Sequence, residues 1–479
     1  MTRHFRQPLP KLPDSFRFGV ATADHQCEAL DERYPDVRDI WDRIRGRQER
    51  GKATDFAVRY REDIGLARDA GCKVFRFSVA WARVEPEPGR FNSEALAHYQ
   101  RVAEAVCEAG MQPMVTLHHF VWPPHIEQRG GMTSPDFPNW FAAYAAAVAA
   151  ALGSRVDDWI TLNEPNILCF GYIRPWWLRD YAFHPGLPDE CGLSHQLRMI
   201  GRLIPNLFQA HRLSREAIHR INPQARVGAN PAILGLPAWL QRLIDFVATR
   251  SGALDRFERG NRKRSTSEPA DTVQRKSILQ SIAGRFQRFL EPFSIFATVL
   301  CTSWWHLGQA GRLPEFLCPE RCIGTQDYVG LDYFWALRTL NVARVKNLAK
   351  ALTTGWYEHA PVCPEALYGI LNRHSRMFPH LPVYVLEIGC VEVADGIKRA
   401  EFYESHIEQV QRAVADGVNV NAFVAWSITS NREWSSTFGP GSDFGLYHVD
   451  LDGDPMLIRR TTPALQVYRK IIADRGVSV

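Results

Sequence analysis

The segment WITLNEP, at residues 159–165, is a short apolar run that ends on Glu164 before a proline. A second run, VYVLEIG at residues 383–389, ends in a similar way on Glu387. Short apolar runs of this kind are typical of strands that are buried on both faces of a parallel sheet. In a closed β/α barrel the carboxyl ends of all strands meet at one mouth, where active sites are assembled. The two runs therefore predict two carboxyl groups that face one pocket.

Six further runs of β-branched and aromatic residues have the length of strands, and long helical patterns separate most of them. Together with the two runs above, the predicted strands are 16–21, 74–79, 113–117, 159–163, 225–229, 328–334, 383–387 and 422–427. The predicted helices include 94–109, 137–152, 203–221, 400–416 and 463–473. Eight strands with intervening helices predict the α/β class and a single (β/α)8 barrel. A dinucleotide-binding sheet is disfavoured, because no Gly-rich loop follows the first strand.

The length and the composition fit one large catalytic domain that spans residues 1–479. Of these residues 46% are hydrophobic and 23% are charged, as in an ordinary globular protein. The 57 Lys and Arg residues against 52 Asp and Glu residues leave a formal charge of +5. This excess is too small over such a length to indicate a nucleic-acid partner.

The positive charge is concentrated in one segment, residues 250–290, which holds ten Lys or Arg against four Asp or Glu. The second half of this segment has apolar residues at the spacing of an amphipathic helix. We expect an insertion at about 240–310, between the fifth and sixth strands. Three roles are open for its basic helix: packing on the barrel with a solvated outer face, peripheral contact with an anionic membrane, and binding of a partner.

The chain carries no export signal that we recognise. Residues 1–14 lack the apolar core of a signal peptide, and the apolar stretches at 142–152 and 292–300 fall short of the ~20 residues of a membrane-spanning helix. The ten cysteines include no Cys-x-x-Cys pair, which is typical of reduced thiols. We therefore expect a cytoplasmic protein.

Two facing carboxyl groups are what the cleavage of a glycosidic bond requires. One group protonates the leaving oxygen, while the other attacks the sugar or activates a water molecule. A glutamate that ends a strand is often merely solvated, so either residue alone is a weak signal. The pair Glu164 and Glu387 is a stronger signal than either residue, because no other two predicted strands end in this way. This chemistry needs no metal and no organic cofactor.

The chain resembles glycoside hydrolase family 1, the β-glucosidase and β-galactosidase family, from about Phe16 to Tyr468 apart from the basic insertion. The Thr-Leu-Asn-Glu-Pro motif that carries the acid/base glutamate of the family is intact at residues 161–165. The nucleophile motif keeps only Glu387 and Gly389. The resemblance implies that Glu387 is the nucleophile and that Glu164 is the acid/base residue.

Further motifs of the family follow in the expected order. The opening segment, the strand-two motif RFSVAWAR at 76–83 and the strand-eight motif WSITSNREW at 426–434 are all recognisable. In the family the first Arg of the strand-two motif, here Arg76, lies near the nucleophile, where a cation keeps a carboxylate ionised. The residues that the resemblance places on the sugar are Gln26, His119, Asn163, Trp356, Trp426, Glu433 and Trp434.

Three departures from the family pattern lie beside the predicted reaction centre. The Asn that follows the nucleophile is replaced by Ile388. The Asn-x-Tyr motif of strand six reads Asp332, Tyr333 and Phe334, so the family tyrosine that contacts the nucleophile aligns with a phenylalanine. Loss of a hydrogen bond to an ionised carboxylate costs about 1 to 3 kcal/mol and raises the pKa of that carboxylate. Tyr333 replaces the lost hydroxyl only if the strand register differs from this alignment.

The resemblance implies a retaining β-glycosidase that acts on terminal β-linked sugars. A β-glucoside is the first candidate, with β-galactosides and β-fucosides next, and apolar residues near the pocket mouth suggest a hydrophobic aglycone. One alternative is a transglycosidase that uses the same covalent intermediate. Another is a carbohydrate-binding homologue of weak activity, which the departures around the two glutamates would explain.

Overall fold

The computed structural model describes residues 9–172, 191–249, 291–292, 294–337, 341–434 and 438–477. Its centre is an eight-stranded parallel sheet in the order β5-β4-β3-β2-β1-β10-β7-β6. The strands are β1 (Arg17–Ala21), β2 (Val74–Ser78), β3 (Gln112–His118), β4 (Asp158–Asn163), β5 (Arg226–Asn230), β6 (Val329–Asp332), β7 (Val383–Ile388) and β10 (Val420–Trp426). All eight predicted strands are therefore confirmed, with ends that differ by one or two residues.

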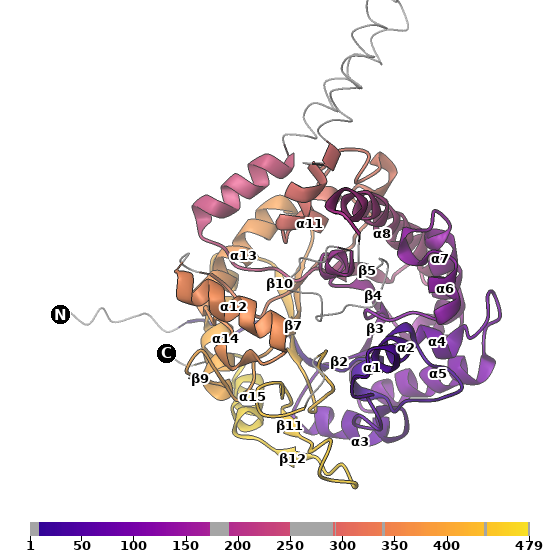
Figure 1. Ribbon diagram of the computed structural model, residues 1–479. Helices are drawn as coiled ribbons and strands as arrows, with labels where there is room; N and C mark the ends of the chain where they lie inside the picture. The colour runs from indigo at the N-terminus through magenta and orange to yellow at the C-terminus, as the bar shows by residue number, and fades with distance from the viewer. Residues whose placement is uncertain are drawn as a thin grey trace, which may run out of the picture.

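The sheet closes on itself between β5 and β6, the two strands at the ends of the order. Single bridges join Ala232 to Asp332 and Gly235 to Ala336 in the parallel sense. The backbone N–H of Ile233 donates to the carbonyl of Asp332 at 2.9 Å. The predicted (β/α)8 barrel is thus confirmed, and Figure 1 shows the strands inside a ring of helices.

Long helices cover the outside of the barrel (Figure 1). They are α3 (Phe56–Asp69), α5 (Ser93–Glu108), α7 (Phe137–Leu152), α8 (Leu193–Ile221), α12 (Val342–Thr354), α13 (Pro364–Met377), α14 (Arg399–Ala415) and α15 (Pro463–Asp474). The predicted helices 94–109, 137–152, 400–416 and 463–473 are confirmed within one residue. The helix predicted at 203–221 begins ten residues earlier, at Leu193.

Short elements lie in the connections. The helices among them are α1 (Asp24–Cys27), α2 (Val37–Ile44), α4 (Trp81–Val84), α6 (Pro124–Gln128) and α11 (Trp304–Gln309). The 3-10 turns are η1 (Gly131–Thr133), η2 (Gly153–Arg155), η3 (Ile167–Gly171), η6 (Glu320–Cys322) and η7 (Tyr357–His359). Two small antiparallel pairs complete the list, β8 (Val393–Ala394) with β9 (Ile397–Lys398) and β11 (Tyr447–His448) with β12 (Arg460–Thr461).

Apolar strands and helix faces account for this packing. All residues of β2, β4, β6 and β7 are buried, as expected for strands with helices outside and side chains inside the barrel. The Ala-rich helix α7 buries Phe137, Phe141, Tyr144 and other residues of one face, and it ends at Gly153, whose φ of 60° suits a glycine.

An ion cluster at the amino-terminal ends of the strands fixes the opposite mouth of the barrel. Asp158 begins β4, is buried, and accepts hydrogen bonds from Arg17 on β1 at 2.5 Å and from Arg226 on β5 at 2.7 Å.

Part of the predicted insertion lies outside the described residues, including the basic amphipathic segment 250–290. Within the part of the chain that is described, no helix combines the length and the apolar character needed to cross a membrane. None of the ten cysteines forms a disulfide bond.

Replacement of Phe208 by Ala will test the packing between α8 and α11. The Phe208 ring is fully buried and stacks on Trp305 with ring centroids 4.6 Å apart. Because a buried aromatic ring is lost and leaves a cavity, we expect F208A to lower the free energy of unfolding by about 3 to 5 kcal/mol. The measurement is denaturant unfolding, and V58A is the control, since Val58 on α3 is 73% exposed. Equal stability of F208A and wild type would contradict this packing.

Candidate active site

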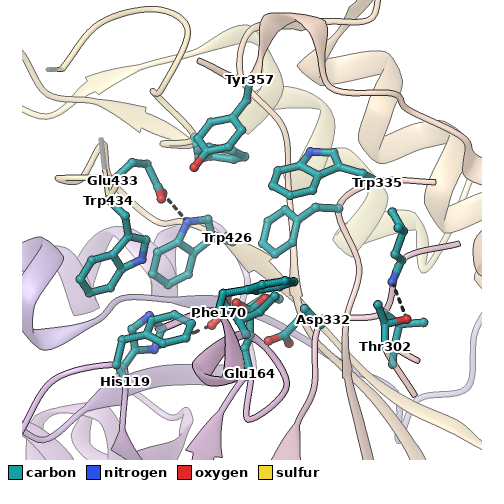
Figure 2. A pocket seen from close by; sticks show the side chains of 18 of the residues that line it. His119, Glu164, Phe170, Thr302, Asp332, Trp335, Tyr357, Trp426, Glu433 and Trp434 are labelled. Carbon is teal, nitrogen blue, oxygen red and sulfur yellow. Dashed lines mark hydrogen bonds and ion pairs between the residues drawn. The ribbon is translucent and has the colours of Figure 1, made fainter. Parts of the chain in front are cut away.

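A pocket opens at the carboxyl ends of the strands. Figure 2 shows Glu164 and Asp332 in one part of the pocket, Trp426, Trp434 and Glu433 beside them, and Trp335 and Tyr357 farther from the two carboxyl groups. The predicted site residues that line it are Gln26, His119, Glu164, Asp332, Phe334, Glu387, Trp426, Glu433 and Trp434. The fold thus gathers residues from both ends of the sequence around one cavity.

Glu164 and Glu387 face one another from opposite sides of the barrel. Glu387 lies within β7, while Glu164 is the first residue after β4. With Asp332 at the end of β6, they form a cluster in which one oxygen of each carboxyl group lies within 4.8 Å of an oxygen of each of the others. The sequence predicted the meeting of the two glutamates, but it did not predict a third carboxyl group at this distance.

The backbone at Glu164 is in a left-handed conformation, with a φ of 41°. A residue other than glycine pays about 1 to 3 kcal/mol for such a conformation, and it persists only where the surroundings hold it. Here the Glu164 N–H donates to the carbonyl of Asn230 at 3.1 Å. This turn directs the side chain from the end of β4 into the pocket.

Arg76 connects the carboxyl group of Glu387 to the barrel wall. The guanidinium, which is fully buried, donates to Glu387 Oε1 at 2.5 Å and to the carbonyl of Leu386 at 3.0 Å. It also donates to Asn163 Oδ1 at 2.6 Å and to Thr116 Oγ1 at 3.0 Å. The predicted position of Arg76 beside Glu387 is therefore what the structure has.

The three carboxyl groups differ in how easily they ionise. Burial, and then the charge of Glu387, raise the pKa of Glu164 well above its usual range. The same two causes raise the pKa of Asp332 well above its usual range. Burial also raises the pKa of Glu387, but the Arg76 guanidinium opposes this effect. Of the three carboxyl groups, Glu387 is thus the one that ionises most easily.

His119 adds no charge to this cluster. Its Nδ1 lies 4.0 Å from Glu387 Oε1, and its ring stacks on Trp426 with centroids 5.6 Å apart. Burial, and then the neighbouring Arg76 cation, lower the pKa of His119 well below its usual range. The imidazole is therefore neutral at ordinary pH, and its Nε2 makes a 3.0 Å hydrogen bond with Gln26 Oε1.

A second polar group lies on the side of the pocket formed by Gln26, Trp426 and Glu433. The Trp426 indole donates to Glu433 Oε1 at 2.8 Å, and the Gln26 amide donates to Glu433 Oε2 at 3.3 Å. Burial raises the pKa of Glu433 to about 8. Flat indole rings beside amide and carboxyl groups fit a sugar, which presents C–H faces and hydroxyl groups together.

Asn163 lies behind Glu164 and carries one unused donor. Its Oδ1 accepts from Arg76 and from the Asn230 side chain, the latter at 2.6 Å. Its Nδ2 is buried and has no hydrogen-bond partner among the described residues. An amide donor left free beside the two glutamates is suited to a ligand hydroxyl.

Four predicted residues are absent from the pocket lining: Arg76 and Asn163, which lie beside the glutamates, and Trp356 and Tyr333. Trp356 packs over the glycines of the loop at 439–441, and its neighbour Tyr357 lines the pocket instead. The Tyr333 hydroxyl donates to the carbonyl of Cys363 at 2.5 Å, so it does not replace the hydroxyl missing at Phe334. The register of the sequence alignment thus agrees with the structure at Phe334, which lines the pocket.

Sequence reasoning missed the apolar wall of the pocket. Its residues come from segments that follow β4, β5 and β6 and from later loops: Ile167, Phe170, Ile233, Leu234, Trp335, Leu348, Tyr357 and Phe444. The signal in the sequence was the aromatic pair at 334–335, at the end of the predicted strand 328–334. Trp176 and Trp177, which follow the fourth strand in the sequence, lie outside the described residues.

The barrel has two facing carboxyl groups in its pocket, with indole rings beside amide and carboxyl groups. These features are typical of enzymes that cleave glycosidic bonds. The sequence profile of glycosyl hydrolase family 1 matches residues 9–233 and 337–477. The chain therefore belongs to glycosyl hydrolase family 1 and is a glycoside hydrolase. The unmatched residues 234–336 include the predicted insertion and β6.

Full-length relatives share this assignment. A 1,4-beta-D-glucan glucohydrolase of Thermotoga neapolitana is 26% identical, with 98% of this chain and 100% of the relative covered. A bifunctional beta-D-glucosidase/beta-D-fucosidase of Bifidobacterium breve is 28% identical, with 97% and 99% covered. The solved family 1 β-glucosidase of Thermotoga maritima has the same fold, with a TM-score of 0.70 at 22% identity over 98% of this chain and 99% of that one.

Replacement of Arg76 by Lys will test the role of the guanidinium. A lysine cannot reproduce the four contacts, and a lost hydrogen bond to a charged group costs about 1.5 to 3 kcal/mol. We expect kcat/KM on a β-glycoside to fall roughly 10- to 100-fold. We also expect the acid limb of the pH profile to move to higher pH, because the lysine ammonium cannot reproduce the 2.5 Å hydrogen bond from Arg76 that lowers the pKa of Glu387.

The control is R17K, which changes the same residue type in the ion cluster at the other mouth of the barrel. It should leave the pH profile in place. An unchanged acid limb in R76K would show that Arg76 does not set the ionisation of Glu387.

Proposed function

We propose that this protein is a retaining β-glycosidase in which Glu387 is the nucleophile and Glu164 is the acid/base residue. The observation that carries the proposal is the distance between them, because an oxygen of one carboxyl group lies within 4.8 Å of an oxygen of the other. Retaining glycosidases have carboxyl groups about 5 to 5.5 Å apart, whereas inverting enzymes leave about 6.5 to 9.5 Å for a water molecule. The spacing supports retention.

In the first half of the reaction, a Glu387 oxygen attacks the anomeric carbon while Glu164 donates its proton to the departing oxygen. The bond to the aglycone breaks, and a glycosyl ester forms on Glu387. In the second half, Glu164 accepts a proton from water, and the resulting hydroxide attacks the anomeric carbon. The sugar leaves with its original configuration, and both side chains return to their starting states.

The charges of the pocket support these two roles. The carboxylate of Glu387 is one cause of the raised pKa of Glu164, which suits a proton donor. When the ester forms, this negative charge is lost, so the pKa of Glu164 falls and the residue can act as a base. The free Nδ2 of Asn163 is available to the sugar 2-hydroxyl, where a hydrogen bond strengthens as positive charge develops on the ring.

We propose a terminal β-glucoside as the first substrate, with β-fucosides and β-galactosides as further candidates. The names of the relatives, a glucan glucohydrolase and a glucosidase/fucosidase, support this order. Gln26, His119, Trp426 and Glu433 would bind the sugar, since they line the same side of the pocket. The reaction takes its proton and its nucleophile from side chains, so the proposal includes no metal and no cofactor.

The apolar wall supports a hydrophobic aglycone. Beyond the carboxyl cluster the pocket is lined by Phe170, Ile233, Leu234, Trp335 and other apolar residues. A second sugar would find few hydrogen-bond partners here, whereas an alkyl or aryl group would bury apolar surface at about 25 cal/mol per Å². We therefore propose alkyl or aryl β-glycosides rather than oligosaccharides.

Glutamine variants of the two glutamates will test the assigned roles on a panel of nitrophenyl β-glycosides. We expect E387Q to lose turnover at least 1,000-fold, about 4 kcal/mol, because no ester can form. E164Q should retain activity on activated leaving groups, which need no proton, and azide should restore part of its turnover as a β-glycosyl azide.

E401Q is the matched control, since Glu401 is exposed on α14. It should behave as wild type. Full activity of E387Q would remove the proposed nucleophile, and absence of turnover by wild type on the whole panel would favour a carbohydrate-binding homologue.

The preference for an apolar aglycone is tested by comparing octyl β-glucoside with cellobiose. We expect a kcat/KM at least tenfold higher for the octyl glucoside, because its chain lies on the apolar wall. W335A should reduce this ratio about tenfold, while the kcat/KM for cellobiose stays within a few-fold of wild type. A higher kcat/KM for cellobiose would contradict the proposed aglycone class.

A further inference from the structure

Asp332 is a buried acid in the reaction centre to which the mechanism above gives no task. It is fully buried at the end of β6, and it is paired in register with Glu387 on the neighbouring strand β7. Its oxygens belong to the cluster in which each carboxyl group lies within 4.8 Å of the other two. A carboxylate in such a position adds a like charge next to a nucleophile that is itself negative.

The hydrogen bonds of Asp332 are unequal. Oδ2 accepts from the Asn230 side chain at 2.5 Å. Oδ1 is buried and has no hydrogen-bond partner among the described residues. A buried carboxylate oxygen without a donor is costly, whereas the O–H of a carboxylic acid at the same place needs only an acceptor.

Glu387 offers that acceptor. Within the described part of the chain, the hydrogen bond that its carboxyl group accepts comes from Arg76, at Oε1. The neighbouring side chains supply no hydroxyl for its other oxygen, because Phe334 has none and the Tyr333 hydroxyl donates to Cys363. The nucleophile therefore has room for one more donor, and Asp332 is the adjacent polar group on β6.

The charges around Asp332 also favour a proton on it. Glu387 faces it from β7 and Glu164 faces it from the end of β4, while Arg76 on β2 supplies the compensating positive charge. Asn230 on β5 is neutral, and burial keeps the nearby His119 neutral as well. Glu433 is a further acid, whose pKa burial raises to about 8. With one guanidinium in contact with the cluster, one ionised carboxyl group balances the charge.

We propose that Asp332 is a protonated positioning residue, which donates a hydrogen bond to the Glu387 carboxylate and keeps Glu387 the single negative charge of the cluster. The proposal rests on Glu387 acting as the nucleophile. Loss of the donor would raise the pKa of Glu387, whereas an amide at position 332 would preserve it, since an amide N–H also donates and carries no charge. These two substitutions therefore have different expected effects.

The pH dependence of kcat/KM for a nitrophenyl β-glucoside will be compared for wild type, D332N and D332L. For D332N we expect both limbs of the profile within about 0.3 pH unit of wild type. For D332L we expect the acid limb to move up by about one unit, with a tenfold lower kcat/KM at acid pH and an alkaline limb that stays in place. A merely structural role would change the unfolding midpoint without moving the acid limb.

Movement of both limbs to lower pH in D332N would overturn the proposal, because it would mean that an ionised Asp332 had been raising the pKa of its two neighbours. An acid limb that stays in place in folded D332L would overturn the donor role. If D332L does not fold, D332N decides alone. Limbs of the pH profile that stay in place support a neutral Asp332, and limbs that move to lower pH contradict it.

Infrared difference spectroscopy separates this proposal from the proposed function. Subtraction of D332N from wild type at neutral pH should leave the C=O band of a carboxylic acid, whatever Glu387 does in catalysis. The matched control is D69N, since Asp69 is exposed on α3 and paired with Arg68 at 2.8 Å. A carboxylate band in place of the acid band in the D332N difference would show that Asp332 is ionised and would overturn the proposal. The two proposals can also fail separately. If the acid band is present but the E387Q variant is active, Asp332 is protonated and Glu387 is not the nucleophile.

Discussion

The contact between Arg76 and Glu387 is the interaction on which the site depends. Three carboxyl groups share a buried space in which like charges repel strongly, and a guanidinium is in contact with one of them. This asymmetry favours ionisation of Glu387 over ionisation of its two neighbours. In the proposed mechanism, the difference between the nucleophile and the acid, which are chemically the same side chain, therefore originates in the position of one cation.

The barrel fixes the position of Arg76 relative to the residues that it contacts. Arg76 lies on β2, Glu387 on β7 and Asn163 at the end of β4, so each partner is fixed by strands that are buried on both faces. The left-handed turn at Glu164 is a local departure from unstrained backbone, and the neighbouring β5 holds it by a hydrogen bond. The sheet fixes the positions of these side chains, and the strained backbone at Glu164 directs the Glu164 side chain into the pocket.

Much of the fold and the carboxyl pair could be predicted from sequence because both depend on local patterns. Apolar runs of strand length marked all eight strands, and glutamates at the ends of two of them marked the reaction centre. The apolar wall was missed because it is built from irregular segments after the strands, such as Ile233 and Leu234, which have no periodicity to read. For the same reason Trp356 and Tyr357, neighbours in a loop, could not be told apart. The third carboxyl group was visible as a departure at Asp332, but its closeness to Glu387 depends on strand register and barrel closure.

The account is tested most directly by trapping the enzyme with a 2-deoxy-2-fluoro β-glucosyl donor and mapping the labelled peptide by mass spectrometry. The fluorine disfavours the positive charge of the transition state, so the second step slows and the ester accumulates. We predict one label per chain, on the peptide that contains Glu387. A donor that is turned over while this peptide stays unlabelled, or a label on a different carboxyl group, would contradict the central assignment.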